Sequence, residues 1–264
     1  MDKRTNEEML ELILNFAKTH SQIEVVGMEG SRANPNVSPD DFQDFDITYF
    51  VDTSEHLVQL KQENWEEAFG KTIISQEPEN LFADYGFTKL MLFEDENRID
   101  LKILLISDVE DYLESESLNT IIYGGESVET SEKSFLVNAP SEQEFYECVN
   151  EFYWVSTYIV KGLSRDQLLY ANGMLEKVVR PELLKILSWK SFIGENAGKE
   201  NYKLLEVYPE LAELYKLGSV QETWQALIKM EKMFRKSLYS FDFPIPNEVE
   251  KTSEYIQKYF LMNQ

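Results

Sequence analysis

The stretch GSRANPNVSPDDFQDFDITYFV, residues 30–51, decides how the first part of this chain folds. It begins with the pair Gly30-Ser31, passes through a loop that contains two prolines, and ends in a mostly apolar run typical of a β-strand. A short apolar run at residues 23–28 precedes it and predicts another strand. We therefore expect a strand, a glycine-serine turn, a long loop and a second strand in succession.

Three carboxylates belong to this part of the sequence. Asp44 and Asp46 open the second strand, and because alternate strand residues point to the same face, their side chains project together. Asp100 lies in a later apolar strand, whose residues Ile99 and Leu101 are expected to face the core on the opposite side. Neighbouring carboxylates repel one another, and a hard cation such as Mg²⁺ offsets this cost while also binding phosphate. Each motif alone is weak, since a D-x-D pair at a strand start is more often an exposed sheet edge.

The pair Gly30-Ser31 and the neighbouring Arg32 suit a phosphate group. Glycine lets the backbone approach closely, serine offers a hydroxyl and an N–H, and arginine offers charge-assisted hydrogen bonds. Glycine-serine pairs are also common in ordinary turns. The order of the motifs (glycine-serine, then D-x-D, then an aspartate in a later strand) is therefore more informative than any one of them.

The surrounding pattern predicts an α+β domain over residues 1–138. A T-x-x-E capping box at Thr5 and Glu8 begins a helix. Further short helices are expected at 56–62 and 65–69, and further strands at 72–75, 87–93 and 98–106. Together these elements predict helices packed on a mixed or antiparallel sheet.

Residues 139–264 are expected to form a separate, helical domain. A break at residues 138–141 interrupts the pattern, and apolar residues follow it at helical spacing. Helices are expected at 141–162, 165–178, 181–193, 207–216, 219–240 and 247–261. Cys148, in the first of these, is expected to be a buried apolar residue. The chain thus predicts a sheet-based domain followed by a helical bundle.

Charge and composition exclude several classes of function. The chain has 48 acidic and 25 basic residues, a net charge of −23, and residues 1–140 hold 30 of the acidic and 10 of the basic ones. Nucleic acid polymers and anionic membranes need a basic surface, so neither is an expected partner. A single cysteine excludes an intrachain disulfide, and two isolated histidines argue against zinc. We find no signal peptide and no membrane-spanning run, and expect a cytoplasmic protein.

Taken together, the motifs resemble those of the nucleotidyltransferase superfamily related to DNA polymerase beta. The runs MEGSRANPNV (28–37), FQDFDI (42–47) and NRIDL (97–101) are similar to motifs of the aminoglycoside 6-adenylyltransferases, also called streptomycin adenylyltransferases. Glu29 stands where that family has asparagine.

The second half carries the same resemblance. The pair Arg180-Pro181 ahead of Trp189, and the run GKENYK (198–203), are similar to two further segments of the family. Glu200 is an insertion in the second of these segments. The resemblance therefore extends over most of the chain.

The resemblance implies an enzyme that transfers AMP from ATP to a hydroxyl of an aminoglycoside, releases pyrophosphate and confers antibiotic resistance. For streptomycin the hydroxyl is at position 6. Asp44 and Asp46 are implied Mg²⁺ ligands, and Asp100 is implied either as the general base or as a third metal ligand. The residues implied in nucleotide binding are Gly30, Ser31, Arg32, Lys199 and Lys203. For the two lysines, a solvated helix end is an equal alternative.

Two alternative functions remain open from the sequence. The same chemistry could act on another acceptor, either a different aminoglycoside or a protein side chain. The fold could also serve as a non-catalytic, nucleotide-binding regulatory module, although three retained carboxylates argue against that. The sequence leaves the oligomeric state open as well.

The acidity of the first half fits a cationic substrate. An acidic field attracts a cationic aminoglycoside and raises its rate of encounter. The acids Asp40, Asp41 and those at 94–96 are expected to be exposed loop charges, some of which could line a cleft for such a substrate.

Overall fold

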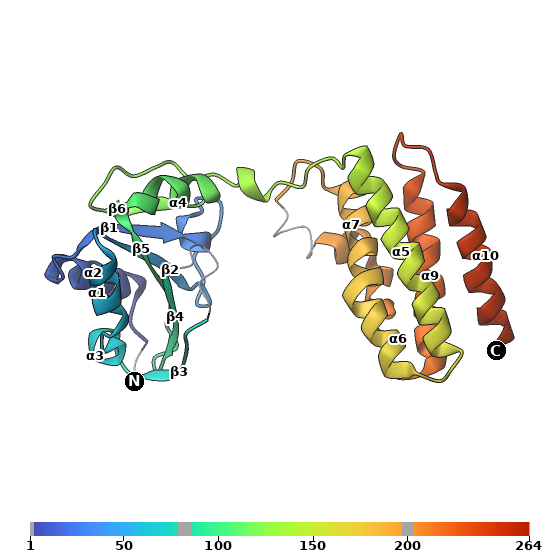
Figure 1. The fold of residues 1–264 in the computed structure, drawn as a ribbon, viewed down its shortest axis with the longest axis horizontal. Coiled ribbons are helices and arrows are strands. Elements are labelled where there is room, and N and C mark those ends of the chain that lie inside the picture. The colour runs from blue at the N-terminus through green and yellow to red at the C-terminus, as the bar shows by residue number, and fades with distance from the viewer. Residues whose placement is uncertain (1–2, 79–85, 197–202, 264) are drawn as a thin grey trace. The chain divides into compact units, whose positions relative to one another are not determined.

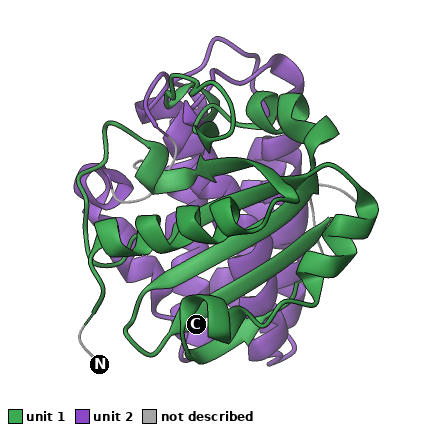
Figure 2. Cartoon of the chain, turned by 90° about the vertical axis from the view of Figure 1, so that its left-hand side faces the viewer, with its two compact units in different colours: residues 1–134 green, residues 135–264 purple. Residues whose placement is uncertain are grey.

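The computed structural model describes residues 3–78, 86–196 and 203–263. The chain folds into two compact units, residues 1–134 and 135–264, which Figure 2 shows in different colours. The first unit combines a sheet with helices, and the second is helical (Figure 1). This confirms the expected fold class, an α+β part followed by a helical bundle. No helix among the described residues is long and apolar enough to cross a membrane.

The sheet of the first unit is mixed. Its six strands are β1 (Ile23–Glu29), β2 (Phe45–Val51), β3 (Thr72–Gln76), β4 (Phe87–Phe93), β5 (Arg98–Leu105) and β6 (Thr120–Tyr123). They lie in the order β3-β4-β5-β2-β1-β6. The central strands β2 and β5 are parallel, and all other pairs of the sheet are antiparallel. The edge strand β6 was not expected from the sequence.

The two faces of this sheet are covered differently. Three helices, α1 (Asn6–Thr19), α2 (Ser54–Lys61) and α3 (Trp65–Phe69), contribute to the main core, with strand residues such as Ile47 and Tyr49. On the other face, Tyr112 of α4 (Val109–Ser115) packs in a small cluster with residues that include Phe50 and Leu104. Because side chains alternate along a strand, Asp46 and Asp100 belong to this second, thinly covered face. Asp44, expected to open the strand, lies one residue before β2. Helix α4 was not expected from the sequence.

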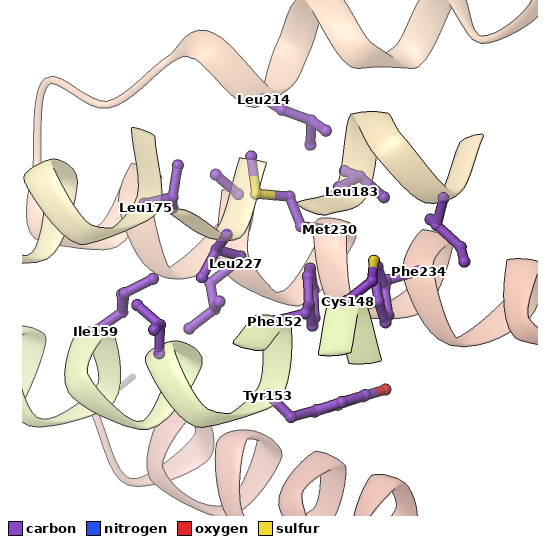
Figure 3. Packing of buried hydrophobic residues seen from close by; sticks show 14 of the residues in the cluster. Cys148, Phe152, Tyr153, Ile159, Leu175, Leu183, Leu214, Leu227, Met230 and Phe234 are labelled. Carbon is purple, nitrogen blue, oxygen red and sulfur yellow. The ribbon is translucent and has the colours of Figure 1, made fainter. Parts of the chain in front are cut away.

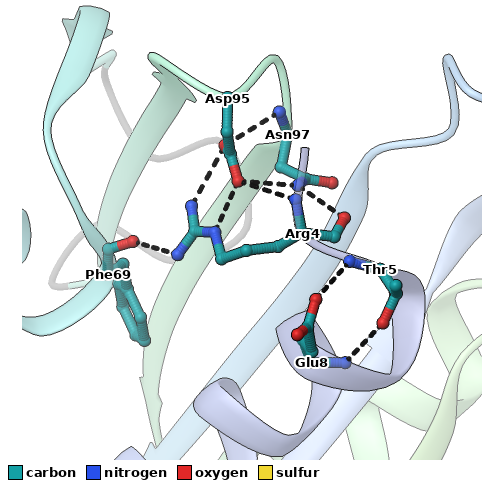
Figure 4. A network of polar contacts seen from close by, with 6 residues as sticks. All are labelled: Arg4, Thr5, Glu8, Phe69, Asp95 and Asn97. Carbon is teal, nitrogen blue, oxygen red and sulfur yellow. Dashed lines mark hydrogen bonds and ion pairs between the residues drawn. The ribbon is translucent and has the colours of Figure 1, made fainter. Parts of the chain in front are cut away.

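A buried ion pair fastens the β4–β5 turn to the start of α1 (Figure 4). Arg4 Nε lies 2.5 Å from Asp95 Oδ2, and Arg4 Nη1 donates to the carbonyl of Phe69 at 2.6 Å. Asn97 Nδ2 donates to Asp95 Oδ2 at 3.0 Å and to the Arg4 carbonyl at 3.1 Å. Beside this network, Thr5 and Glu8 form the expected capping box. Asp95 is 3% exposed, so the expectation that it is an exposed loop charge was wrong.

The second unit is a bundle around one apolar core. Its described α-helices include α5 (Glu142–Leu163), α6 (Leu168–Met174), α7 (Arg180–Ser191), α9 (Val220–Leu238) and α10 (Asn247–Met262), with a π-helical turn at Leu175–Val179. Phe152 of α5 stacks on Phe234 of α9 with ring centroids 3.8 Å apart (Figure 3). Cys148 lies in this core, as expected.

One segment of the second unit differs from the expected α-helix. Residues Pro209–Tyr215 form a 3₁₀-helix. Its buried residues are Leu211 and Leu214, three positions apart. A 3₁₀-helix stacks residues i and i+3 on one side, so this tighter turn buries both leucines together.

Candidate active site

Three carboxylates form a row across the thinly covered face of the sheet. Asp46 on β2 is the register partner of Asp100 on the parallel strand β5 and of Glu29 on the antiparallel strand β1. Directly opposite residues on neighbouring strands project to the same face, so the three side chains lie side by side. Asp44 lies one residue before β2, and Arg98 contacts both Asp44 and Asp100. The adjacent strands β1, β2 and β5 are labelled in Figure 1. We call Glu29, Asp46 and Asp100 the carboxylate row.

Asp46 lies where the negative charge is most concentrated. Burial, together with the neighbouring charges of Glu29, Asp100 and Asp44, raises the pKa of Asp46 to about 7, against the opposing charge of Lys102. Burial is also the main cause that raises the pKa of Asp44. Carboxylates held this way are stabilised by any cation that binds between them.

Arg98 supplies part of the compensating charge. Its Nε lies 2.7 Å from Asp100 Oδ1 and its Nη2 lies 2.8 Å from Asp100 Oδ2, a bidentate ion pair. Its Nη1 lies 3.4 Å from Asp44 Oδ2, so one guanidinium bridges Asp100 on β5 and Asp44, which directly precedes β2. Arg98 and Asp100 are two residues apart in β5, so their side chains lie on one face. This spacing could have predicted the ion pair from the sequence.

The donor set fits a hard divalent cation. Asp44, Asp46 and Asp100 offer only carboxylate oxygens, the donors that Mg²⁺ prefers. Among the described residues, no group of three or more His, Cys, Asp or Glu side chains converges in a ready-made metal site. Arg98 bridges Asp44 and Asp100 instead.

Gly30 brings its backbone against Asp46. It opens a 3₁₀ turn, Gly30–Ala33, with a φ of 71°, a conformation that side-chain-bearing residues rarely adopt. A Cβ at this position would lie 2.4 Å from Asp46 Oδ2. Ser31 follows, half-buried, and its carbonyl accepts a hydrogen bond from Gln43 Nε2 at 3.4 Å. The structure therefore brings the glycine-serine turn and the carboxylates together.

Arg32 holds the start of β2. Its guanidinium lies 3.6 Å from the centre of the Phe45 ring. Its Nε donates to the Asp44 carbonyl at 2.9 Å and its Nη2 donates to the Gln43 carbonyl at 2.8 Å. These contacts fix the backbone next to Asp44, a positioning role that the sequence did not suggest. Binding of phosphate by Arg32 stays a prediction.

The two candidate lysines belong to the helical unit. Lys203 is ion-paired with Glu195, and its Nζ lies 5.8 Å from the centre of the Phe192 ring. Lys199 lies outside the described residues. A role of either lysine in nucleotide binding stays a prediction.

The ion pair between Glu29 and Lys102 was not predicted from the sequence. Lys102 Nζ lies 2.6 Å from Glu29 Oε2, and Thr48 donates to Glu29 Oε1 at 3.0 Å. The Glu29 side chain is only 12% exposed, so its charge needs this partner. The position where the resembling family has asparagine is therefore occupied by a carboxylate that Lys102 neutralises.

This fold and site define a class of protein. Asp46 on β2, Asp100 in register on the parallel strand β5, and a glycine-serine turn close to Asp46 form a candidate nucleotidyltransferase site, with Asp44 directly before β2. The chain belongs to the streptomycin adenylyltransferase family, whose model matches residues 3–259. This confirms the family resemblance that the motifs indicated.

Curated relatives agree with this assignment. The chain is 37% identical over 254 residues to an aminoglycoside 6-adenylyltransferase of Bacillus subtilis (strain 168), covering 88% of each chain. It is 33% identical over 277 aligned positions to one of Campylobacter jejuni, covering 96% of this chain and 95% of the other. A solved aminoglycoside 6-adenyltransferase from Bacillus subtilis is 29% identical, with a TM-score of 0.47 and 97% and 99% of the two chains covered. The chain is thus an enzyme of the nucleotidyltransferase class.

Proposed function

We propose that this enzyme transfers AMP from ATP to a hydroxyl of an aminoglycoside and releases pyrophosphate. The observation that carries the proposal is the register of Asp46 with Asp100, beside the Gly30 backbone. The names of the relatives, aminoglycoside 6-adenylyltransferases, support the 6-hydroxyl of a streptomycin-like compound as the first acceptor to test. We propose the cytoplasm as the location of this enzyme, because ATP is available there.

Asp44 and Asp46 are the proposed metal ligands. When bound, Mg²⁺ supplies charge neutralisation for the phosphates. The raised pKa of Asp46, caused by burial and the neighbouring carboxylates, supports this assignment, because the group gains most from a nearby cation. Lys102 keeps the Glu29 carboxylate engaged beside the site.

Gly30 and Ser31 are the proposed phosphate cradle. The Gly30 backbone is so close to Asp46 that an added Cβ would lie 2.4 Å from Asp46 Oδ2, which supports a phosphate site at the turn beside the proposed metal ligand. Ser31 adds a hydroxyl and an N–H at the next position. The first 140 residues carry few bases, so these neutral donors matter more than they would on a basic surface.

Asp100 is the proposed acceptor of the proton from the attacking hydroxyl. Arg98 fixes its orientation through two hydrogen bonds, one to each oxygen. A carboxylate oxygen has a second lone pair, so each Asp100 oxygen keeps one acceptor site for a hydroxyl or a cation. Service as a third metal ligand would use the same atoms, and both roles need the ionised carboxylate.

An acceptor panel tests the proposed function. Purified protein with Mg²⁺ and ATP is mixed with streptomycin, with other aminoglycosides and with no acceptor, and released pyrophosphate is measured while mass spectrometry looks for an AMP adduct. We expect release and an adduct with at least one aminoglycoside. Exchange of Glu11, an exposed acid of α1, for glutamine leaves the rate unchanged and serves as the control. No adduct across the panel contradicts the proposal and leaves a protein acceptor or a regulatory role.

A further inference from the structure

A hollow of about 730 Å³ lies within the first unit and is lined by Asp44 and by Arg98, the partner of Asp100 in the carboxylate row. Its floor continues the same sheet face, because Leu90 on β4 is the register partner of Asp100, and Leu92 is the partner of Arg98. Ile74 on β3 lies opposite Leu92 and extends this floor. The loop before β2 and the segment at residues 3–7 complete the lining. We call this space the β4 hollow.

Two exposed apolar side chains lie next to charged groups in the lining of the β4 hollow. Phe42 is 92% exposed and Ile74 is 65% exposed. Both line the hollow, and Phe42 lies only two residues before Asp44. Ligand sites combine apolar walls with a few placed polar groups, and their volumes are on the order of 300–1,000 Å³. The size and the lining of the hollow both meet this description.

The charges around the hollow favour a cation. The exposed acids of its lining are Glu7, Asp40, Asp41 and Glu96. The bases are engaged elsewhere: Arg4 by Asp95, Arg98 by Asp44 and Asp100, and Arg32 by backbone carbonyls. Lys3, also in the lining, donates to the backbone carbonyl of Asp41 at 2.7 Å. The exposed carboxylates attract cationic groups. Arg32 and Lys3 donate to neutral backbone carbonyls and keep their positive charge.

The geometry of phosphoryl transfer separates the two substrates. The attacking oxygen and the leaving pyrophosphate lie roughly in line, on opposite sides of the phosphorus. The turn at Gly30 follows β1, on one side of Asp46, whereas the floor of the hollow, on β4 and β3, lies on the other side of Asp46, beyond Asp100. Arg32 of the turn also reaches the lining of the hollow. With pyrophosphate leaving toward the turn, the hydroxyl approaches from the hollow and passes Asp100 on the way.

We infer that the β4 hollow receives a ring of the cationic aminoglycoside acceptor. Phe42 and Ile74 contact the apolar face of the ring, and the exposed carboxylates of Asp40 and Asp41 attract its ammonium or guanidinium groups. A cationic group above an aromatic face gains additional attraction. This inference rests on the proposed function and specifies where, in the first unit, the acceptor is recognised.

Steady-state kinetics with both substrates varied test the inference. In Phe42→Ala and Ile74→Ala we expect the KM for the aminoglycoside to rise about tenfold, equivalent to about 1.4 kcal/mol, with the KM for ATP changed by less than about twofold. Asp40→Asn combined with Asp41→Asn should raise the acceptor KM as well, and less so at high salt. Val58→Ala, on the half-exposed outer side of α2, removes apolar surface on the opposite face of the sheet and should change neither KM.

The outcomes distinguish this inference from the proposed function. If the wild-type enzyme transfers AMP and the Phe42 and Ile74 variants keep the wild-type acceptor KM, the β4 hollow does not bind the acceptor. A rise in the KM for ATP instead assigns the hollow to the nucleotide and overturns the inference. An inactive wild-type enzyme across the panel overturns the proposed function and, with it, this acceptor site. Unchanged melting temperatures, expected for such exposed residues, show that the variants remain folded.

Discussion

Asp46 lies directly opposite Asp100 on the neighbouring parallel strand, with Glu29 directly opposite it on the other side. Neighbouring strands are about 4.8 Å apart, so three acidic side chains are held at close range by the backbone alone. The protein compensates this charge with Arg98 and Lys102, each ion-paired to a member of the row. We propose that this row is the site that receives a cation and phosphate.

Replacement of Gly30 by alanine should damage both the fold and the site. The φ of 71° disfavours any side chain, and the new Cβ would lie 2.4 Å from Asp46 Oδ2. We expect the free energy of unfolding to fall by about 2 kcal/mol, measured by urea denaturation, together with a large loss of AMP transfer.

Gly173→Ala is the matched control for this prediction. Gly173 is in helix α6, and a Cβ there meets nothing within 4 Å. Because alanine is the better helix former, this variant should keep its activity and gain up to about 1 kcal/mol. Equal stability losses in both variants would refute the structural explanation given for Gly30.

The Glu29–Lys102 pair should behave as a coupled unit. Lys102→Met leaves a nearly buried carboxylate without its cation, and we expect a loss of about 2 kcal/mol in unfolding free energy. The double variant Glu29→Gln with Lys102→Met removes both charges and should lose less than the two single variants combined. Additive losses would mean that the 2.6 Å contact contributes nothing.

The Arg4–Asp95 pair predicts a dependence of stability on pH. Burial alone would raise the pKa of Asp95, but hydrogen bonds from Arg4 and Asn97 outweigh it and hold the pKa below its ordinary value. The stabilisation is therefore complete above the unfolded pKa of about 3.9 and is lost as the pH falls below it. Asp95→Asn should be less stable than the wild type by about 2 kcal/mol at pH 7, and this difference should shrink toward pH 3.

A neighbouring acid provides the comparison for Asp95. Glu94 lies in the same turn and is exposed. Glu94→Gln should unfold like the wild type at both pH values, by urea denaturation followed by circular dichroism. A gap between wild type and Asp95→Asn that stays constant with pH would show that the ionised pair is not what stabilises the turn.

Cys148 should report on opening of the helical bundle. It is 1% exposed, its Sγ donates to the Glu182 carbonyl at 3.5 Å, and burial raises the pKa of the thiol. Since the thiolate is the reactive form, a thiol reagent at pH 8 should modify the native protein far more slowly than the protein in denaturant. The chain has a single cysteine, so the rate reports on this position alone. Rapid labelling of native protein would contradict the packing around α5.

Local patterns were sufficient to predict most elements of the first unit and to name a set of candidate site residues, whose roles stay predictions. Strand alternation placed Asp44 and Asp46 on one face, and the apolar neighbours of Asp100 placed it on a strand face opposite the core. The same patterns predicted a sheet that is either mixed or antiparallel, and the structure has the mixed sheet. The confirmed family resemblance came from short motifs of high specificity.

Long-range pairing could not be predicted from the sequence. Glu29 and Lys102 are 73 residues apart, and they meet only because β1, β2 and β5 are neighbours. Asp95 looks like any turn acid until Arg4, 91 residues away, is brought against it. Strand order sets both contacts, and no local pattern encodes strand order.

The most direct test of the central claim is AMP transfer by the wild type and by Asp46→Asn. Each protein is incubated with Mg²⁺, ATP and streptomycin, and pyrophosphate release is followed at saturating substrate. We predict transfer by the wild type and a loss of at least about 10³-fold in Asp46→Asn, with the fold intact by circular dichroism. Wild-type rates in Asp46→Asn would contradict the assignment of the carboxylate row as the catalytic site.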